Sequence, residues 1–324
     1  MKKRNISLKY QEYISLNGEK QLLVQQVGDG SIIKRFDKTP YPSKPNDVIC
    51  PHFLELKWGY GCPYHCAWCY LQGTLRLLPT KTKPKAKDYS KIKQHLENFF
   101  NATVNNGYRP ELLNAGELAD SLMWENNEVP FSKFIVSIFE TQDKHKVLFL
   151  SKSGNIDNLI KFRSDKLIPS FTLNAPLVSR RWEKGSPSIE KRIKDAKELF
   201  ELGYPVRIRI DPIIPIENWK KEYTSLIQSI FSFFEPERIT LGSLRGLQST
   251  INNAYDKTWV KYLSEHSSWG KKIDSSTRYF TYKYIIDHIK DEYDYTEIAM
   301  CKETKDIWIK LNMDYTKIKC NCVW

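Results

Sequence analysis

Three cysteines, Cys62, Cys66 and Cys69, lie in one short segment with the spacing C-x3-C-x2-C. Three thiolates on one loop can hold three irons of a [4Fe–4S] cube, which leaves the fourth iron free to bind another molecule. An electron-carrying ferredoxin uses four cysteines, and a structural zinc site also uses four ligands. The nearby candidates for a fourth ligand are His52 and His65, and His65 lies inside the loop, where ligation would strain it. The spacing therefore predicts a cluster with one open corner.

This spacing resembles the signature of the radical S-adenosylmethionine (radical SAM) superfamily. The resemblance implies that the open iron chelates the amino and carboxylate groups of S-adenosylmethionine, and that an electron from the reduced cluster releases a 5′-deoxyadenosyl radical. It also implies an external electron donor of the flavodoxin or ferredoxin type. The alternative is a non-catalytic binding protein with a structural zinc or cluster and a basic face. Structural zinc is disfavoured because no fourth ligand has zinc-like spacing.

Strands alternating with helices surround the cysteine loop. The expected strands cover residues 53–58, 111–115, 146–150, 170–174, 205–210 and 238–241, and the expected helices cover 89–104, 130–140, 155–162, 188–202 and 218–234. This alternation predicts an α/β fold with a parallel sheet and right-handed crossovers. Six such units are too few for an eightfold barrel, so we predict a partial (β/α)6 barrel. An open doubly wound sheet is the competing architecture.

The chain is expected to have three parts: an N-terminal extension (1–50) with a hairpin at 20–35, the partial barrel (51–244) and a C-terminal extension (245–324). The last part breaks the rhythm and is expected to be mostly helical, with one strand near 297–300. No run approaches the roughly 20 apolar residues of a membrane helix, and no apolar segment follows the basic start of the chain. We therefore expect a cytoplasmic protein that does not enter a membrane.

The chain carries a net charge of +12, from 50 Lys and Arg against 38 Asp and Glu. Hydrophobic residues make up 41%, which excludes a mostly disordered chain. The positive surplus favours a polyanionic partner, with nucleic acid first. The alternative is charge spread over a solvated surface. The densest basic run, 81–87, suits either phosphate binding or a solvated loop.

A narrower resemblance, to the spore photoproduct lyase family, covers most of residues 50–312. It begins with the segment CAWCYLQ around the last two loop cysteines. Lys152, in LSKSGNID, resembles the lysine that contacts the cofactor, and Thr172 and Asn174, in FTLNA, match the strand that places a hydroxyl on it. Gly116 and Glu117 resemble the superfamily's Gly-Gly-Glu element, whose carboxylate contacts the methionyl ammonium.

Near the C-terminus, Arg278 and Tyr279 resemble an Arg-Tyr pair that lies near the substrate, and the segment that begins at Cys301 resembles the family's last strand and helix. The resemblance implies a lyase that repairs a methylene-bridged thymine dimer in DNA. The adenosyl radical takes a hydrogen from the dimer, the bridge fragments, and a cysteine returns a hydrogen. We therefore predict hydrogen abstraction from a thymine-like base in nucleic acid, with DNA favoured.

The chain departs from the family where the resemblance implies the hydrogen-donating cysteine, because residues 114–120 contain no cysteine. Tyr70 is one candidate to pass a hydrogen, as the matching tyrosine does in the family. Cys301 and the terminal cysteines are others. The same departure keeps a second function open, in which a radical SAM isomerase or transferase modifies or rearranges a nucleobase instead of splitting a dimer.

Two cysteines, Cys320 and Cys322, are the fifth and the third residue from the end of the sequence. With Cys301 they offer three thiols that suit an auxiliary iron–sulfur cluster, a zinc ion, or a redox or hydrogen-donor pair. The alternative is an exposed tail with idle thiols. Cys50 stands alone in the sequence and is interpreted as a core residue.

Overall fold

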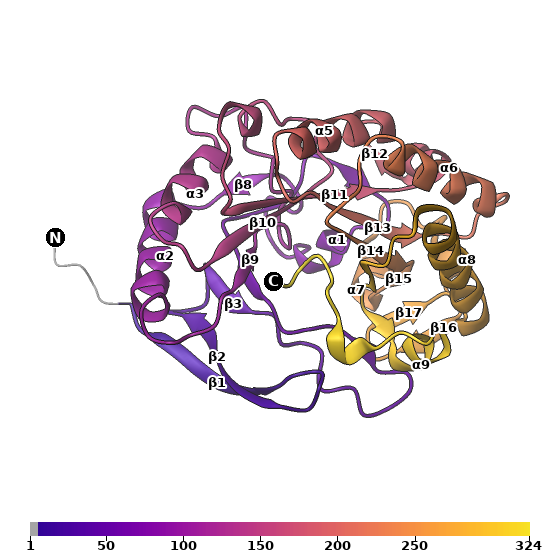
Figure 1. Cartoon of the computed structure of the whole chain (residues 1–324), viewed down its shortest axis with the longest axis horizontal. Coiled ribbons are helices and arrows are strands. Elements are labelled where there is room, and N and C mark those ends of the chain that lie inside the picture. The colour runs from indigo at the N-terminus through magenta and orange to yellow at the C-terminus, as the bar shows by residue number, and fades with distance from the viewer. Residues whose placement is uncertain (1–5) are drawn as a thin grey trace.

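Ten strands form the main sheet of the computed structural model, which describes residues 6–324 (Figure 1). From one edge of the sheet to the other, they are β1 (Leu8–Ile14), β2 (Lys20–Val27), β3 (Ile33–Arg35), β5 (Leu54–Leu56), β9 (Leu112–Asn114), β10 (Lys146–Ser151), β11 (Leu167–Leu173), β13 (Arg207–Ile213), β14 (Arg238–Ser243) and β18 (Ile298–Met300). The strands from β5 to β18 pair in parallel, and β1, β2 and β3 add to β5 as antiparallel strands.

The parallel strands lie in chain order, with no reversal along the sheet. A doubly wound sheet reverses its strand order at a switch point, so this order excludes the competing architecture. All six predicted parallel strands are present, and β18 adds a seventh. The middle of the sheet is buried on both faces, as the fully buried sequence LIPSFTL of β11 illustrates.

Helices cover the outer side of the curved sheet, and two short ones, at 71–74 and 248–253, lie nearer the centre of the view (Figure 1). The helices are α1 (Leu71–Thr74), α2 (Tyr89–Thr103), α3 (Phe131–Phe139), α4 (Pro176–Trp182), α5 (Ile189–Glu201), α6 (Trp219–Phe231), α7 (Gln248–Asn253), α8 (Ser275–Tyr293) and α9 (Lys305–Lys310). No helix in this part of the chain, residues 6–324, has the length and apolar character needed to cross a membrane.

Helix α5 shows why the sequence pattern predicts these elements well. The side chain of Ser188 caps the helix by accepting a hydrogen bond from the Lys191 amide. Ile189 and Ile193 are spaced to face the sheet and are buried. Gly203 follows the last turn with φ of +83°, a left-handed conformation that glycine adopts without a steric penalty.

The predicted helix at 155–162 is wrong, because only a short 3-10 turn, Leu159–Lys161, forms there. Side chains compete with the helix in this segment. Asn155 donates a hydrogen bond to the Asn126 side chain at 2.7 Å, and Asn158 donates to the Glu125 carbonyl at 3.1 Å. These bonds hold the chain in a loop that crosses from β10 to β11.

The C-terminal extension contains the predicted helices, with α8 the longest, but it also contains short strands that we did not predict. It contains a three-stranded sheet of β15 (Arg245–Gly246), β17 (Gly270–Lys272) and β16 (Glu265–Ser267), and strands this short leave no periodic signal in the sequence. The N-terminal extension does contain the predicted hairpin, as β2 and β3. The two extensions also meet, because β4 (Val48–Ile49) pairs with β19 (Glu303–Thr304). Of the predicted N-terminal part, residues 1–5 lie outside the described residues.

The C-terminal tail enters the interior of the curved sheet, where its end is visible at the centre of Figure 1. The buried Asn321 side chain donates to Ser170 Oγ at 2.8 Å and to the Ile208 carbonyl at 3.0 Å, and it accepts from Thr240 Oγ1 at 2.7 Å. Arg207 donates to the Asn321 carbonyl at 2.8 Å. One side chain thus connects the tail to three neighbouring strands.

We predict that Asn321→Ala lowers the free energy of unfolding by about 2–4 kcal/mol, because it leaves buried polar groups on three strands without partners. Urea unfolding followed by circular dichroism measures this change. Lys319→Ala, at an exposed position of the same tail, is the control and is expected to cost less than about 0.5 kcal/mol. Equal midpoints for the two variants would contradict this role of the tail.

Candidate functional site

The carboxyl ends of the parallel strands border a cleft with a cavity of about 330 Å³. Each strand places residues there in turn: Gly116 and Glu117 follow β9, Lys152 follows β10, and Thr172 lies near the end of β11. Carboxyl ends of neighbouring parallel strands meet at one edge of a sheet, which explains this convergence. Four of the five residues predicted to bind the cofactor therefore line one cavity.

The three loop cysteines line the same cavity. Their loop is held to the protein by the short strands β7 (His65–Cys66) and β12 (Glu183–Lys184), and by the Gln72 side chain, which donates to the Cys66 carbonyl at 3.1 Å. Burial raises the pKa of all three thiols, Cys62, Cys66 and Cys69. Without a metal these thiols stay protonated, and a bound metal would remove their protons.

The cavity suits a [4Fe–4S] cluster with a small ligand beside it. Backbone amides of Tyr64 and Leu71 donate to the thiols of Cys62 and Cys69, as protein amides do toward cluster sulfurs. Within residues 6–324, no three His, Cys, Asp or Glu side chains form a group that could hold a single metal ion as they stand. The cysteine trio therefore supplies thiols around a wide space, not a preformed site for one ion.

Gly116 is required by close packing at the edge of the cleft. A Cβ atom at this position would lie 2.4 Å from the Leu150 Cβ, so no larger residue fits without a shift of β10. The neighbouring Glu117 is held by Asn114, whose side-chain amide donates to Glu117 Oε1 at 3.2 Å. Tyr70 also donates to the Glu117 carbonyl, which links the cysteine loop to the end of β9.

Lys152 is positioned by a buried carboxylate behind the cysteine loop. Its ammonium lies 3.3 Å from Glu183 Oε1, and the other Glu183 oxygen lies 2.7 Å from Arg192 Nη1. Burial alone would raise the pKa of Glu183, but Lys152 and Arg192 outweigh burial and hold that pKa below its ordinary value. The ionised Glu183 therefore fixes the Lys152 side chain at the edge of the cavity.

Asn174, which the resemblance implied as a cofactor ligand, does not line the cleft. It is fully buried, donates to the Pro212 carbonyl at 2.8 Å, and accepts from the Ala175 amide and the Tyr223 hydroxyl. Its polar atoms are occupied within the fold. We therefore assign it a structural role at the junction of β11 with α4.

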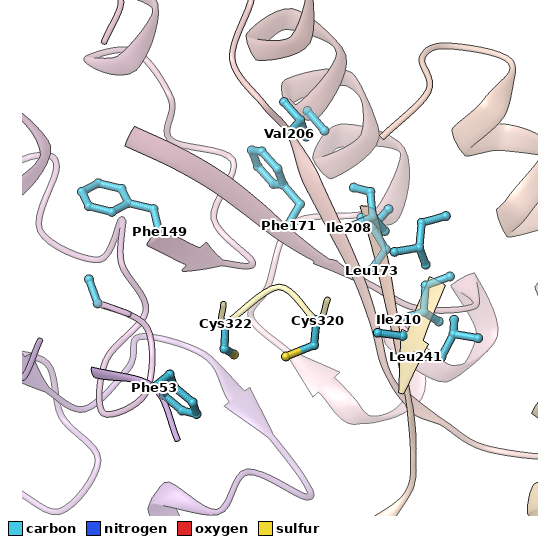
Figure 2. Close-up of a cluster of buried hydrophobic side chains, with 14 of the residues drawn as sticks. Phe53, Phe149, Phe171, Leu173, Val206, Ile208, Ile210, Leu241, Cys320 and Cys322 are labelled. Atoms are coloured by element: carbon cyan, nitrogen blue, oxygen red, sulfur yellow. The ribbon is translucent and has the colours of Figure 1, made fainter. Parts of the chain in front are cut away.

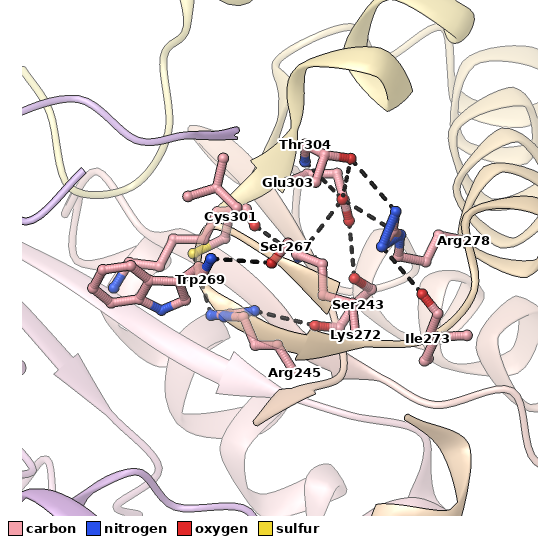
Figure 3. Close-up of polar contacts among 12 residues, drawn as sticks. Ser243, Arg245, Ser267, Trp269, Lys272, Ile273, Arg278, Cys301, Glu303 and Thr304 are labelled. Atoms are coloured by element: carbon pink, nitrogen blue, oxygen red, sulfur yellow. Dashed lines mark hydrogen bonds and ion pairs between the residues drawn. The ribbon is translucent and has the colours of Figure 1, made fainter. Parts of the chain in front are cut away.

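Arg278 and Tyr279 do not line the cleft either, although we predicted them on the substrate side. The Arg278 guanidinium is fully buried beside Glu303 and donates to the Ile273 carbonyl at 3.1 Å (Figure 3). It also donates to Glu265 Oε1 at 3.2 Å. These bonds hold α8 against the three-stranded sheet. The geometry does not support a substrate-side role for either residue.

The opposite side of the cleft carries charged and aromatic residues that the sequence analysis left unassigned. Asp211 accepts from Arg209 at 2.8 Å and from Arg245 at 2.8 Å. Burial alone would raise the pKa of Asp211, but the two guanidinium groups outweigh it and lower that pKa. The alternation RIRID in β13 was a usable signal, because residues two apart on a strand share one face.

An aromatic pair closes this side of the cleft. The Lys302 ammonium lies 4.4 Å from the centre of the Phe36 ring and 4.5 Å from the centre of the Trp269 ring. The half-buried Trp269 and Lys302 both line the cavity. A cation over two aromatic rings makes favourable cation–π contacts, so these three side chains form a defined wall.

Cys301 lies behind the cleft and lines a small cavity of about 20 Å³ together with Cys50, Cys320 and Cys322. Its Sγ accepts a hydrogen bond from Arg209 at 2.9 Å. This cavity has room for little more than one water molecule, which excludes an iron–sulfur cube. The structure brings the three predicted thiols together, buried and not on an exposed tail, and it moves Cys50 from an isolated core position into a group of four thiols.

A family model for spore photoproduct lyase matches residues 51–315. The chain belongs to the spore photoproduct lyase family. Spore photoproduct lyase of Bacillus subtilis (strain 168) is 25% identical over 176 residues, which cover 54% of this chain and 50% of that protein. Spore photoproduct lyase of Clostridium acetobutylicum is 25% identical over 173 residues, which cover 52% of this chain and 48% of that protein. The chain thus spans about half the length of these curated relatives.

Solved structures of spore photoproduct lyase share the fold. One, complexed with a dinucleoside spore photoproduct, has a TM-score of 0.63 at 16% identity and covers 80% of both chains. A mutant with bound AdoMet and dinucleoside spore photoproduct has a TM-score of 0.61 at 16% identity, again over 80% of both chains. The predicted α/β fold and family are therefore confirmed.

We predict that Arg278→Met lowers the free energy of unfolding by about 3–5 kcal/mol, because it leaves Glu303 partly unpaired in the core. Lys283→Met on the same helix is the control. It removes only an exposed ion pair with Asp287 and should cost less than about 0.5 kcal/mol. A stable Arg278→Met protein with weakened nucleic-acid binding would instead support the substrate-side role.

Proposed function

We propose that this protein is a radical SAM enzyme that abstracts hydrogen from a thymine-like base in nucleic acid, as in spore photoproduct repair. The observation that carries the proposal is the single cavity that three loop cysteines share with Glu117, in a chain of this family. The residues present fit a [4Fe–4S] cluster and S-adenosylmethionine. Once bound, these groups supply a carbon-centred radical strong enough to take hydrogen from carbon.

The chain's own residues would bind and orient the cofactor. Cys62, Cys66 and Cys69 would hold three corners of the cluster as thiolates. The Glu117 carboxylate suits a methionyl ammonium through a charge-assisted hydrogen bond. Lys152, fixed by Glu183, suits a negatively charged or carbonyl group of the same ligand. Thr172 offers a hydroxyl that can donate or accept.

The other side of the cleft suits a base that has left its stack. Trp269 offers an aromatic surface, and Lys302 and Arg245 offer positive charge for a flanking phosphate. Stacking on an aromatic ring combined with contacts to phosphate is the general way in which proteins bind unstacked nucleotides. The net charge of +12 adds a long-range attraction to a polyanion.

The hydrogen that completes the reaction would come from Tyr70. This residue lines the cleft, whereas Cys301 lies behind its wall. The hydroxyl of Tyr70 is held by Glu117, which places it beside the ammonium site. We also propose that the protein works in the cytoplasm with a flavodoxin- or ferredoxin-type electron donor, because a reducing compartment keeps its seven cysteines free.

A second function, modification or rearrangement of an undamaged nucleobase, is favoured by one observation. The segment 114–120, which follows β9 into the cleft, contains no cysteine to return a hydrogen. An enzyme that alters a base without returning a hydrogen does not need such a donor. Two substrates separate the two functions: DNA that contains spore photoproduct, and the same DNA without damage. Mass spectrometry of the digested products shows which of the two the enzyme changes.

We predict that the wild-type protein, reconstituted with iron and sulfide under anaerobic conditions, binds about four irons per chain and cleaves S-adenosylmethionine to 5′-deoxyadenosine. The matched control is the triple variant Cys62→Ala, Cys66→Ala and Cys69→Ala, which should lose both. Iron analysis and chromatography measure the two quantities. A wild-type protein that holds its iron but forms no 5′-deoxyadenosine would disprove the proposed enzyme.

We predict that Tyr70→Phe still forms 5′-deoxyadenosine but loses at least about 100-fold in product, because a phenyl ring cannot donate hydrogen. Tyr279→Phe, on a residue outside the cleft, is the control and should keep normal product formation. Product and 5′-deoxyadenosine are measured in the same reaction. A proportionate loss of both would show that Tyr70 only positions Glu117.

A further inference from the structure

The end of the chain places two thiols beneath the cleft. Cys320 and Cys322 are buried, and their side chains turn toward one another inside the curved sheet (Figure 2). The Val323 amide donates to the Cys320 carbonyl at 3.2 Å, which closes a turn with both cysteines on it. Arg207 fixes this turn by donating to the Val323 carbonyl at 2.8 Å. The two thiols are thus held as a pair.

A chain of hydrogen bonds connects this pair with the cleft. The two thiols face each other across the turn (Figure 2), and Asn114 Nδ2 donates to Cys322 Sγ at 3.5 Å. The same Asn114 nitrogen lies 3.2 Å from Glu117 Oε1. The other Glu117 oxygen lies 3.5 Å from the Tyr70 hydroxyl. Tyr70 in the cleft and the tail thiols are therefore separated by only two side chains.

Cys322 is in the chemical form that hydrogen-atom transfer requires. The hydrogen bond from Cys320 and burial together raise the pKa of Cys322 well above its ordinary value. Cys322 therefore carries an S–H group at neutral pH. A protonated thiol is a poor nucleophile, so Cys322 is unsuited to attack on a substrate. It is suited to give up hydrogen to a radical.

We propose that Cys320 and Cys322 are a redox-active dithiol that restores the hydrogen of Tyr70 after turnover. This inference rests on the proposed function, because Tyr70 loses hydrogen only in that reaction. A Tyr70 phenoxyl radical takes one electron and one proton from Cys322, whose S–H bond breaks to leave a thiyl radical. In a second turnover the next Tyr70 radical takes an electron and a proton from the pair, and the two sulfurs bond.

Each disulfide that forms therefore reduces two Tyr70 radicals, and each of these radicals receives one hydrogen from the two thiols. An external dithiol then reduces the disulfide by exchange and becomes oxidised itself. The external dithiol can reach the pair, because Cys322 also lines a second cavity of about 430 Å³. Tyr41 and Trp324 lie at its border and are partly exposed.

The first test needs no radical chemistry. The triple variant Cys62→Ala, Cys66→Ala and Cys69→Ala is equilibrated with mixtures of reduced and oxidised dithiothreitol, and alkylation with mass spectrometry reports each cysteine. We expect a Cys320–Cys322 disulfide that forms reversibly while Cys50 and Cys301 stay reduced. Failure of this pair to oxidise while the protein stays folded overturns the proposal, whatever the activity of the enzyme.

The second test uses the reconstituted enzyme without added thiol. We expect one Cys320–Cys322 disulfide for every two product molecules, and none in the Tyr70→Phe variant. Cys322→Ala should accumulate a tyrosyl radical several-fold above wild type by electron paramagnetic resonance, whereas Cys50→Ala, beside the same cavity, should not. Product without disulfide overturns the dithiol role. Absence of 5′-deoxyadenosine overturns the proposed function instead, and the dithiothreitol titration still decides the redox activity of the pair.

Discussion

Hydrogen bonds between parallel strands in chain order determine where every functional group of this protein lies. Because each strand from β5 to β18 runs in the same direction as its neighbour, all their carboxyl ends reach one edge of the sheet. The cysteine loop, Glu117, Lys152 and Arg209 come from segments far apart in the sequence, yet they line one cavity. A strand in the opposite direction would send its residues to the far edge, where the tail lies.

The sequence predicts the elements that have strong periodicity. Helix α5 has a capping serine, apolar residues at helical spacing and a terminal glycine, and its predicted bounds differ from the structure by one residue at each end. The segment 155–162 has similar apolar residues but also Asn155 and Asn158, whose side chains bond to a distant loop. Such tertiary bonds are invisible in the sequence. The short strands β15 to β17 were missed because two or three residues carry no period.

The sequence predicts those site residues whose chemistry depends on their spacing along the chain. It does not predict which side chains the fold buries away from the cleft. The spacing of the three cysteines already defines their site, and the structure places all three around one cavity. Asn174 and Arg278 resemble functional residues in sequence, but both are buried and bonded within the fold. The contribution of Cys50 was also hidden, because its neighbours Cys301 and Cys322 are more than 250 residues away in the chain.

The wall formed by Phe36, Lys302 and Trp269 has a consequence for ligand selection. The Lys302 ammonium already lies over both rings, which touch each other edge to face. A base that stacks on the covered face of Trp269 must displace this ammonium. The ammonium then loses its aromatic contacts and needs an anion nearby to replace them. A nucleotide supplies both the flat ring and the anion, whereas a free base supplies only the first. Under the proposed function, this wall would favour bases that arrive attached to a phosphate backbone.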